Sequence, residues 1–245
     1  MSNPRFNRHR NKGKSFDAIE EKLWTINFIT AGVNMKKDIL ILGDYKNFQY
    51  HPFEGIDKIL QNLFISAGYN PFCTEDRKEL TSEKISNYSL VVSYTDAWEK
   101  TLEENEINGL VNFIASGNGF LAIHSGIGYK NIEYANLLKA SFIDHPPYQK
   151  ISYSLAENKH PIIENLKDFC LEDELYRFNF YDKKRCEFLM HGTIESGESQ
   201  PALWTINHKE GRIVYIAPGH SIESFKNKEF LKLIKNSAVW AMKEI

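Results

Sequence analysis

Apolar and polar positions alternate along this chain in blocks that predict strands and helices in turn. An uncharged apolar run at 39–42 is followed by a helical pattern over 55–67, and short apolar runs recur at 70–73 and 89–93. Over 107–114, apolar residues follow the i, i+3, i+4, i+7 spacing of a helix that covers a sheet. This order predicts repeated β-α-β units, right-handed crossovers and an open, mostly parallel sheet with helices on both faces.

The second half of the chain is richer in strand patterns. The run at 120–123 is continuous and uncharged, as expected of a central parallel strand covered on both faces. Further strands are predicted at 151–155, 187–191, 202–206 and 212–217. The polar turn 207–211 joins the last two strands, which predicts an antiparallel hairpin. A closing helix is predicted over 228–243, with four residues facing inward: Leu231, Ile234, Ala238 and Trp240.

The first 34 residues differ from the rest. The tract 5–14 is basic, rich in asparagine and without apolar periodicity, which is typical of unfolded chain. Met35 is followed by two lysines and then by the first clear strand pattern, as at a natural start. We therefore expect residues 1–34 to be a disordered tail or a wrongly assigned start, and residues 36–245 to form a single domain.

Composition narrows the classes of partner. A net charge of −2 and 42% hydrophobic residues fit a globular domain, and argue against binding to nucleic acid or to an anionic membrane. No apolar run approaches the roughly 18–20 residues that cross a bilayer. The thiols of Cys73, Cys170 and Cys186 form no CxxC pair, so we expect them to be reduced and mostly buried in a cytoplasmic protein. The composition is compatible with binding of small neutral ligands and with formation of a homo-oligomer.

Several chemically useful side chains follow predicted strand ends. In an open α/β sheet, ligands bind outside the carboxyl ends of the strands, so His51, His124 and His220 are expected in one crevice. His124 stands between a strand and a small-residue turn, as the nucleophile does in a nucleophile elbow. The adjacent Ser125 does not complete the GxSxG motif. An imidazole at this place suits acid/base work, polarisation of a carbonyl or metal ligation.

A second group of candidates lies further along the chain. Glu174 stands among phenylalanines beside Asp173 and Tyr176. A carboxylate among aromatic rings has a raised pKa or a cationic partner, which fits a catalytic acid or a group that orients a histidine. A solvated charge pair at a helix start is the alternative for Glu174, and a structural capping role is favoured for Asp173. Trp98, after a strand end, is a candidate to stack on a sugar ring.

Two further histidines precede prolines, which hold them in extended conformations. His160 is best explained by a structural role. A structural role is also favoured for His145, although the rigid diproline that follows it could present this imidazole to the crevice.

These fragments, taken in order, resemble the ThuA-like (trehalose utilisation) family. The fragments are His51-Pro52, GNGFLAIHS at 117–125, 142–145, His160-Pro161-Ile162, DELY at 173–176, PALW at 201–204 and GRIVYIAPGH at 211–220. The resemblance implies a flavodoxin-like, class I glutamine amidotransferase-like fold in which His124 replaces the nucleophilic cysteine. It also implies a link to sugar catabolism, often alongside oxidoreductases that make 3-keto sugars. One departure is 138–142, where the family commonly has paired glycines.

Carried over residue by residue, the resemblance implies a pocket made by His51, His124, Glu174, Tyr176 and His220. One hypothesis is an enzyme, a hydrolase, lyase or isomerase, that acts on a sugar or 3-keto sugar with His124 and Glu174 as acid/base partners. The other site residues then bind substrate, or the three histidines hold a divalent metal, zinc or manganese. The rival is a non-catalytic sugar-binding or regulatory protein. Glutamine amidotransferase activity is not expected, because the three cysteines lie away from the elbow.

Overall fold

The computed structural model describes residues 37–245, so the expectations for residues 1–34 lie outside the described residues. A large sheet is made by β1 (Asp38–Gly43), β2 (Asn70–Thr74), β3 (Leu90–Tyr94), β4 (Gly119–Ile123), β6 (Gln149–Leu155), β7 (Phe169–Asp173), β9 (Glu187–Thr193), β10 (Ser199–His208) and β11 (Gly211–Ile216). A small sheet is made by β5 (Ala140–Asp144) and β8 (Arg177–Phe180). The helices are α2 (Ile56–Ser66), α3 (Ser82–Ile85), α4 (Glu104–Ala115), α5 (Ile132–Leu138) and α6 (Lys228–Ala241).

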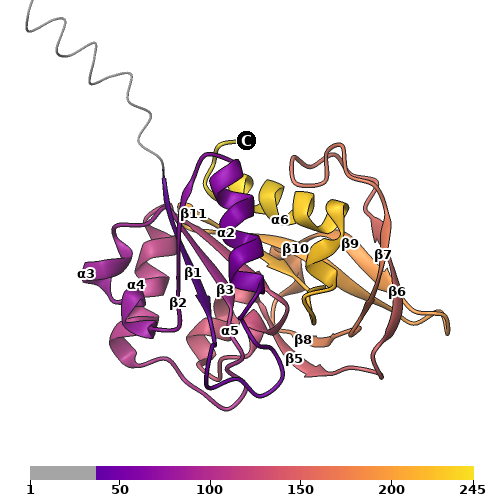
Figure 1. Cartoon of the computed structure of the whole chain (residues 1–245), viewed down its shortest axis with the longest axis horizontal. Coiled ribbons are helices and arrows are strands. Elements are labelled where there is room, and N and C mark those ends of the chain that lie inside the picture. Colours follow the sequence, from indigo (N-terminus) through magenta and orange to yellow (C-terminus); the bar gives the residue numbers. More distant parts are fainter. Residues whose placement is uncertain (1–36) are drawn as a thin grey trace, which may run out of the picture. The chain divides into compact units, whose positions relative to one another are not determined.

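The large sheet has the strand order β2-β1-β3-β4-β11-β10-β9-β6-β7 (Figure 1). Its first five strands pair in parallel, and the pairs from β11 to β7 are antiparallel. The predicted α/β fold class is therefore confirmed. The order 2-1-3-4 is the flavodoxin-like arrangement, in which strands are added on one side of β1 and then on the other, beginning with β3. This switch between β1 and β3 leaves a crevice at their carboxyl ends.

Helices cover both faces of the parallel half. Helix α2 connects β1 to β2, whereas α3 and α4 connect β2 to β3 and β3 to β4, in the opposite direction across the sheet. Because such crossovers are right-handed, α2 lies on one face of the sheet and α3 and α4 lie on the other. Helix α6 contacts α2 and packs on β4 and β11, while α5 packs beside α4 (Figure 1). Covered on two sides, every residue of β3 and β4 is buried. None of the described helices is long and apolar enough to span a membrane.

Most predicted strands and helices are confirmed, and the differences follow from burial. The small-sheet strands, α3, α5 and β7 were not predicted. Strand β7 lies at a sheet edge and alternates buried and exposed residues, so it has no continuous apolar run. In α6, Phe230 and Leu233 are fully buried whereas Leu231 is only half-buried, which corrects its predicted inward place. The three thiols are free as expected, but Cys170 is exposed.

Trp204 on β10 joins the two sheets. Its side chain is fully buried, and its indole N–H donates a hydrogen bond to the Leu138 carbonyl oxygen at 3.0 Å. Its ring lies 4.3 Å from that of Tyr215 on β11, and 5.0 and 5.1 Å from those of Phe178 and Phe180 on β8. Aromatic pairs at these distances add to the stabilisation that burial gives. The small sheet is thus anchored beside the carboxyl ends of the parallel strands.

Gly109 tests how closely α4 is packed. A Cβ atom at this position would lie 2.0 Å from the Leu80 carbonyl oxygen. Replacing glycine by alanine inside a helix normally stabilises by about 1 kcal/mol, but overpacking costs about 1–3 kcal/mol. We predict that Gly109→Ala lowers the free energy of unfolding measured in urea. Asn108→Ala, at an exposed position of the same helix, should leave it unchanged or slightly higher. A Gly109→Ala protein more stable than wild type would contradict this packing.

Candidate functional site

The strand-to-turn junction at His124 has the geometry of an elbow. His124 follows β4 directly, has a φ of 48° and begins a single 3-10 turn that runs from His124 to Ile127. Positive φ is uncommon for a residue other than glycine and concentrates at functional sites. The turn also needs Gly126, since a Cβ there would lie 2.2 Å from the Ser93 carbonyl oxygen. Ser125 is wholly buried in this turn.

The hydrogen bonds of His124 set its tautomer. Its Nδ1 atom lies 2.7 Å from the Ala217 carbonyl oxygen, which can only accept, so Nδ1 carries the proton. Its Nε2 atom therefore presents a lone pair. That atom lies 3.1 Å from Nε2 of His51 and 2.8 Å from the hydroxyl of Tyr176. The His124 side chain has no exposed surface, so it reaches other groups only through Nε2.

The tautomer of His51 is set in the same way. Its Nδ1 atom lies 2.9 Å from Oδ1 of Asp96 and donates to that carboxylate. Its Nε2 atom thus also presents a lone pair, 3.1 Å from the lone pair of His124. Burial lowers the pKa of His51 to about 4, against the opposing effect of Asp96, so the ring is neutral at pH 7. Two facing lone pairs at this distance repel unless a proton or a metal ion lies between them.

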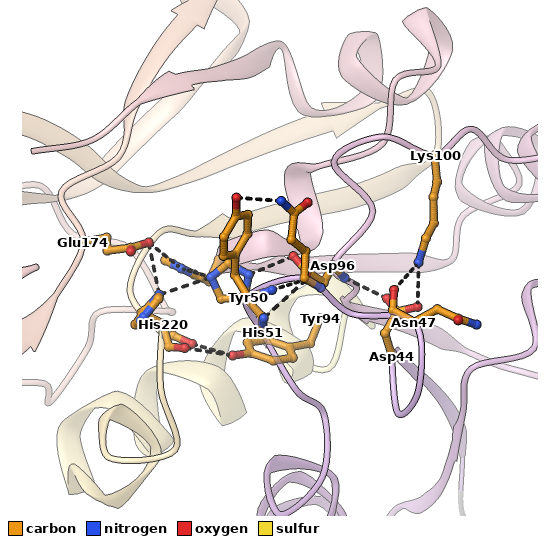
Figure 2. Close-up of polar contacts among 12 residues, drawn as sticks. Asp44, Asn47, Tyr50, His51, Tyr94, Asp96, Lys100, Glu174 and His220 are labelled. Atoms are coloured by element: carbon orange, nitrogen blue, oxygen red, sulfur yellow. Dashed lines mark hydrogen bonds and ion pairs between the residues drawn. The ribbon is translucent and has the colours of Figure 1, made fainter. Parts of the chain in front are cut away.

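Asp96 is held in place by the backbone around it. It accepts hydrogen bonds from the backbone N–H groups of Gln49 and Tyr50, the latter at 2.7 Å. Its own N–H donates to Asp44 at 2.8 Å (Figure 2). Arg77 binds both oxygens of Asp44. Burial alone would raise the pKa of Asp96, but the bonds from His51 and the backbone outweigh it and lower that pKa well below its usual range.

Glu174 and His220 complete the group. Oε2 of Glu174 lies 3.1 Å from Nδ1 of His220 (Figure 2). The same oxygen lies 3.5 Å from Nε2 of His124. Burial would raise the pKa of Glu174, but hydrogen bonds with the two imidazoles lower it well below its usual range. Burial likewise would lower the pKa of His220, but Glu174 raises it. The sequence left two explanations for Glu174, a carboxylate with a raised pKa or a cationic partner, and a solvated charge pair. In the structure Glu174 is paired with imidazoles, and its pKa is not raised.

Asp173 supports the loop that carries His220. It is wholly buried and accepts hydrogen bonds from the Gly219 backbone N–H at 2.9 Å and from the Ser224 hydroxyl at 2.9 Å. The Glu174 N–H donates to it at 2.8 Å. Its role is structural as expected, but it stands at the end of a strand and not at a helix start. Asp173 therefore fixes Glu174 and His220 relative to one another.

His51, His124, Glu174 and His220 form the histidine–carboxylate cluster. One ligand atom from each lies within 4.8 Å of the others. Nε2 of His51 is 3.1 Å from Nδ1 of His220, which matches the 3.1–3.5 Å separations given above. A tetrahedral ion with bonds of about 2.0–2.1 Å holds its ligands about 3.3 Å apart. The four contacts above are close to this value, although the ligand atoms as a whole are only within 4.8 Å of one another. The cluster therefore has the donor types for a small divalent ion and approaches the size of its site.

A cavity of about 870 Å³ adjoins the cluster. Trp98 lines it, with its ring 4.8 Å from that of Phe142 and 6.3 Å from that of His51. Tyr176 lines it as well, and His145 reaches it with its Nε2 atom 3.5 Å from Oε1 of Glu174. His220 and Glu174 keep 25% and 11% of their side-chain surface exposed, so the cluster can be reached from solvent.

Sequence reasoning missed two parts of this site. The role of Asp96 was not assigned, although its place directly after the predicted strand 89–93 was a signal for it. Phe142 was noted only as part of the fragment 142–145, without a role in the cavity, because β5 was not predicted. His160 lies outside the cluster: its Nδ1 accepts from the Ile162 N–H and its ring packs 5.1 Å from that of Trp240. The structural explanation for His160 thus agrees with its contacts.

The fold and site can now be compared with known proteins. A structure of a ThuA-like protein from Parabacteroides merdae ATCC 43184 is similar with a TM-score of 0.71 at 16% identity, covering 85% of this chain and 91% of that one. One from Bacteroides uniformis ATCC 8492 has a TM-score of 0.67 at 18% identity, covering 84% and 91%. A cytoplasmic protein from Salmonella typhimurium LT2 has a TM-score of 0.61 at 14% identity, covering 83% and 99%.

At such identities the structural likeness shows the fold alone. No curated protein sequence matches this chain significantly. The family model for ThuA, described as trehalose utilisation, matches residues 38–241, and that range holds every residue of the histidine–carboxylate cluster. The chain therefore belongs to the ThuA (trehalose utilisation) family.

Proposed function

We propose that this protein is a metal-dependent enzyme of carbohydrate catabolism that acts on a 3-keto sugar. The observation that carries the proposal is the pair of facing lone pairs on His51 and His124. Asp96 and the Ala217 carbonyl oxygen commit the other nitrogen of each ring, so neither can rotate or change tautomer without losing a buried hydrogen bond. A cation in the cluster would be bound by both lone pairs, so the two nitrogens would no longer repel one another.

The cluster's composition supports a divalent ion, zinc or manganese. Three imidazoles and one carboxylate are a common donor set for such ions. The Asp96–His51 bond is the carboxylate–histidine pairing that orients metal ligands in many proteins. When bound, the ion would polarise a substrate carbonyl oxygen as a Lewis acid. The buried rings of His51 and His124 would hold it from below, and the partly exposed Glu174 and His220 would face the substrate.

The family description, trehalose utilisation, supports a carbohydrate substrate. The ketone is proposed from the link to oxidoreductases that make 3-keto sugars, which the sequence resemblance implies. A ketone at C3 acidifies the C–H bond at C2, so a modest base suffices to break it. His145 is an imidazole in the cavity that lies next to the cluster but outside its four ligands. In the proposed step His145 takes the C2 proton, a C1–C2 double bond forms, and the C1–oxygen bond breaks. The departing oxygen receives that proton and leaves as an alcohol.

A proton shared within the cluster would also relieve the repulsion. In that metal-free form of the proposal, His124 and Glu174 are the acid/base pair. The rival function, a non-catalytic sugar-binding protein, has the same cavity but no turnover. Metal content and turnover, measured together, separate the three possibilities.

The first prediction concerns metal content and catalysis. Purified protein should carry about one equivalent of zinc or manganese by mass spectrometry, and His51→Ala and His220→Ala should lose it. His145→Ala should keep the metal but lower kcat on a 3-keto-glucoside by about 10²–10⁴-fold, as expected for a lost general base. His160→Ala, which changes a histidine outside the site, is the control and should keep both.

Other outcomes would redirect the proposal. Full turnover by metal-depleted protein, lost in His124→Ala, would support the metal-free acid/base pair. Sugar binding with no turnover of any 3-keto-glucoside, with or without metal, would support the rival function.

The second prediction concerns the residue that orients His51. Asp96→Asn keeps the side-chain shape but removes the charge that fixes the Nδ1–H tautomer. Loss of such an outer hydrogen bond typically weakens metal affinity by about 10–100-fold. Competition with a coloured chelator at pH 7 measures the change. The exposed Asp168→Asn is the matched control and should bind metal as wild type does. Equal affinity in all three proteins would show that Asp96 does not orient a ligand.

A further inference from the structure

The cavity beside the cluster extends well past the space of one sugar ring. Its volume of about 870 Å³ falls in the range of about 300–1,000 Å³ that encloses drug-sized ligands. His51 and Glu174 of the cluster line one part of its wall, bordered by the rings of Trp98 and Phe142. Ile132, Ser141 and Tyr181 line another part and form no hydrogen bond, ion pair or ring contact with the cluster residues in the described chain. We call this part, together with Trp98 and Phe142, the aromatic chamber.

The polar side chains of Tyr181, Ser141 and Asn131 are already paired with the protein. The hydroxyl of Tyr181 donates to the hydroxyl of Ser141 at 2.8 Å. The side chain of the neighbouring Asn131 bonds to the backbone of Leu102. It accepts from the Leu102 N–H at 2.7 Å and donates to the Leu102 carbonyl oxygen at 3.0 Å. These groups have few hydrogen bonds left to offer a ligand. The hydroxyls of a second sugar in the chamber would therefore lose their hydrogen bonds to water and gain few hydrogen bonds to the protein.

The same pairing holds at the rim of the cavity. Lys130 forms an ion pair with Glu99, and the side-chain amide of Gln49 donates to the hydroxyl of Tyr50 at 2.6 Å. The charges of Lys130 and Glu99 cancel, so the rim has no net attraction for an ionic ligand. These four side chains line the cavity together with the apolar groups.

Several apolar side chains of the cavity, in contrast, are exposed to solvent. Ile132 is 59% exposed and Tyr181 is 45% exposed, although both line the cavity. Tyr50, at the rim, is also 59% exposed. Exposed apolar groups that gather in one concave place mark ligand sites, and burying their carbon surface against an apolar ligand is favourable. The chamber is thus suited to a flat apolar group.

We infer that the aromatic chamber binds the apolar, ring-shaped aglycone of a glycoside whose sugar lies at the histidine–carboxylate cluster. The inference rests on the proposed function for the position of the sugar. It deepens that function by naming the group that leaves: the alcohol or phenol released when the C1–oxygen bond breaks is the ligand of the chamber. The substrate class is then the 3-keto form of aryl or similar apolar glycosides, in preference to disaccharides.

Binding of unoxidised glucosides tests this inference without turnover. Calorimetry would compare phenyl glucoside, methyl glucoside and a disaccharide of the same anomer on the full chain loaded with zinc. We expect phenyl glucoside to bind at least about 10-fold more tightly than the other two. The ratio of phenyl to methyl affinity should fall toward one in Tyr181→Ala and in Ile132→Ser. Ile65→Ser, which changes an exposed apolar residue of α2, should keep the wild-type ratio.

The outcomes separate this inference from the proposed function. Equal affinity for phenyl and methyl glucosides, a disaccharide that binds as tightly as phenyl glucoside, or a ratio unchanged in both chamber variants would overturn the inference. The expected affinities without turnover of any 3-keto-glucoside would overturn the proposed function and leave the chamber assigned.

Discussion

The site depends on one contact, the approach of two imidazole nitrogens that both lack a proton. Nε2 of His51 and Nε2 of His124 lie 3.1 Å apart. Each ring is locked by a hydrogen bond from its other nitrogen, to Asp96 and to the Ala217 carbonyl oxygen. The Tyr176 hydroxyl, 2.8 Å from Nε2 of His124, and Nδ1 of His220, 3.1 Å from Nε2 of His51, can each donate to one of these nitrogens. A positive charge between the two nitrogens would relieve the remaining repulsion, and the surrounding fold holds them in place. Sites that keep such strain are typically prepared for a ligand.

The fold provides that support by bringing strand ends together. His51 follows β1, His124 follows β4, Glu174 follows β7 and His220 follows β11, so the cluster joins both the parallel and the antiparallel parts of the sheet. Buried carboxylates fix the connecting loops: Asp96 holds the loop before His51, and Asp173 ties the turn of His220 to β7. The cluster is therefore part of the folded framework, which favours a rigid, preformed site.

The parallel half of the fold and three of the four cluster residues could be predicted by position. Continuous apolar runs mark β3 and β4 because both faces are covered, and a histidine after such a run lies at the carboxyl end of the sheet. The resemblance then brought Glu174 into the same pocket. Strands β5, β7 and β8 were missed because they lie at an edge or in the small sheet, where apolar runs are short. Tautomers and distances depend on tertiary contacts such as Asp96–His51, which no local pattern encodes.

The central claim is that the histidine–carboxylate cluster is built to hold a cation. Anomalous X-ray diffraction at the zinc absorption edge, from crystals of the protein grown with one equivalent of zinc, tests it most directly. The account predicts a single strong peak about 2.0–2.1 Å from Nε2 of His51 and of His124, Nδ1 of His220 and a carboxylate oxygen of Glu174. A cluster without a peak, in crystals that bind zinc elsewhere or not at all, would contradict it.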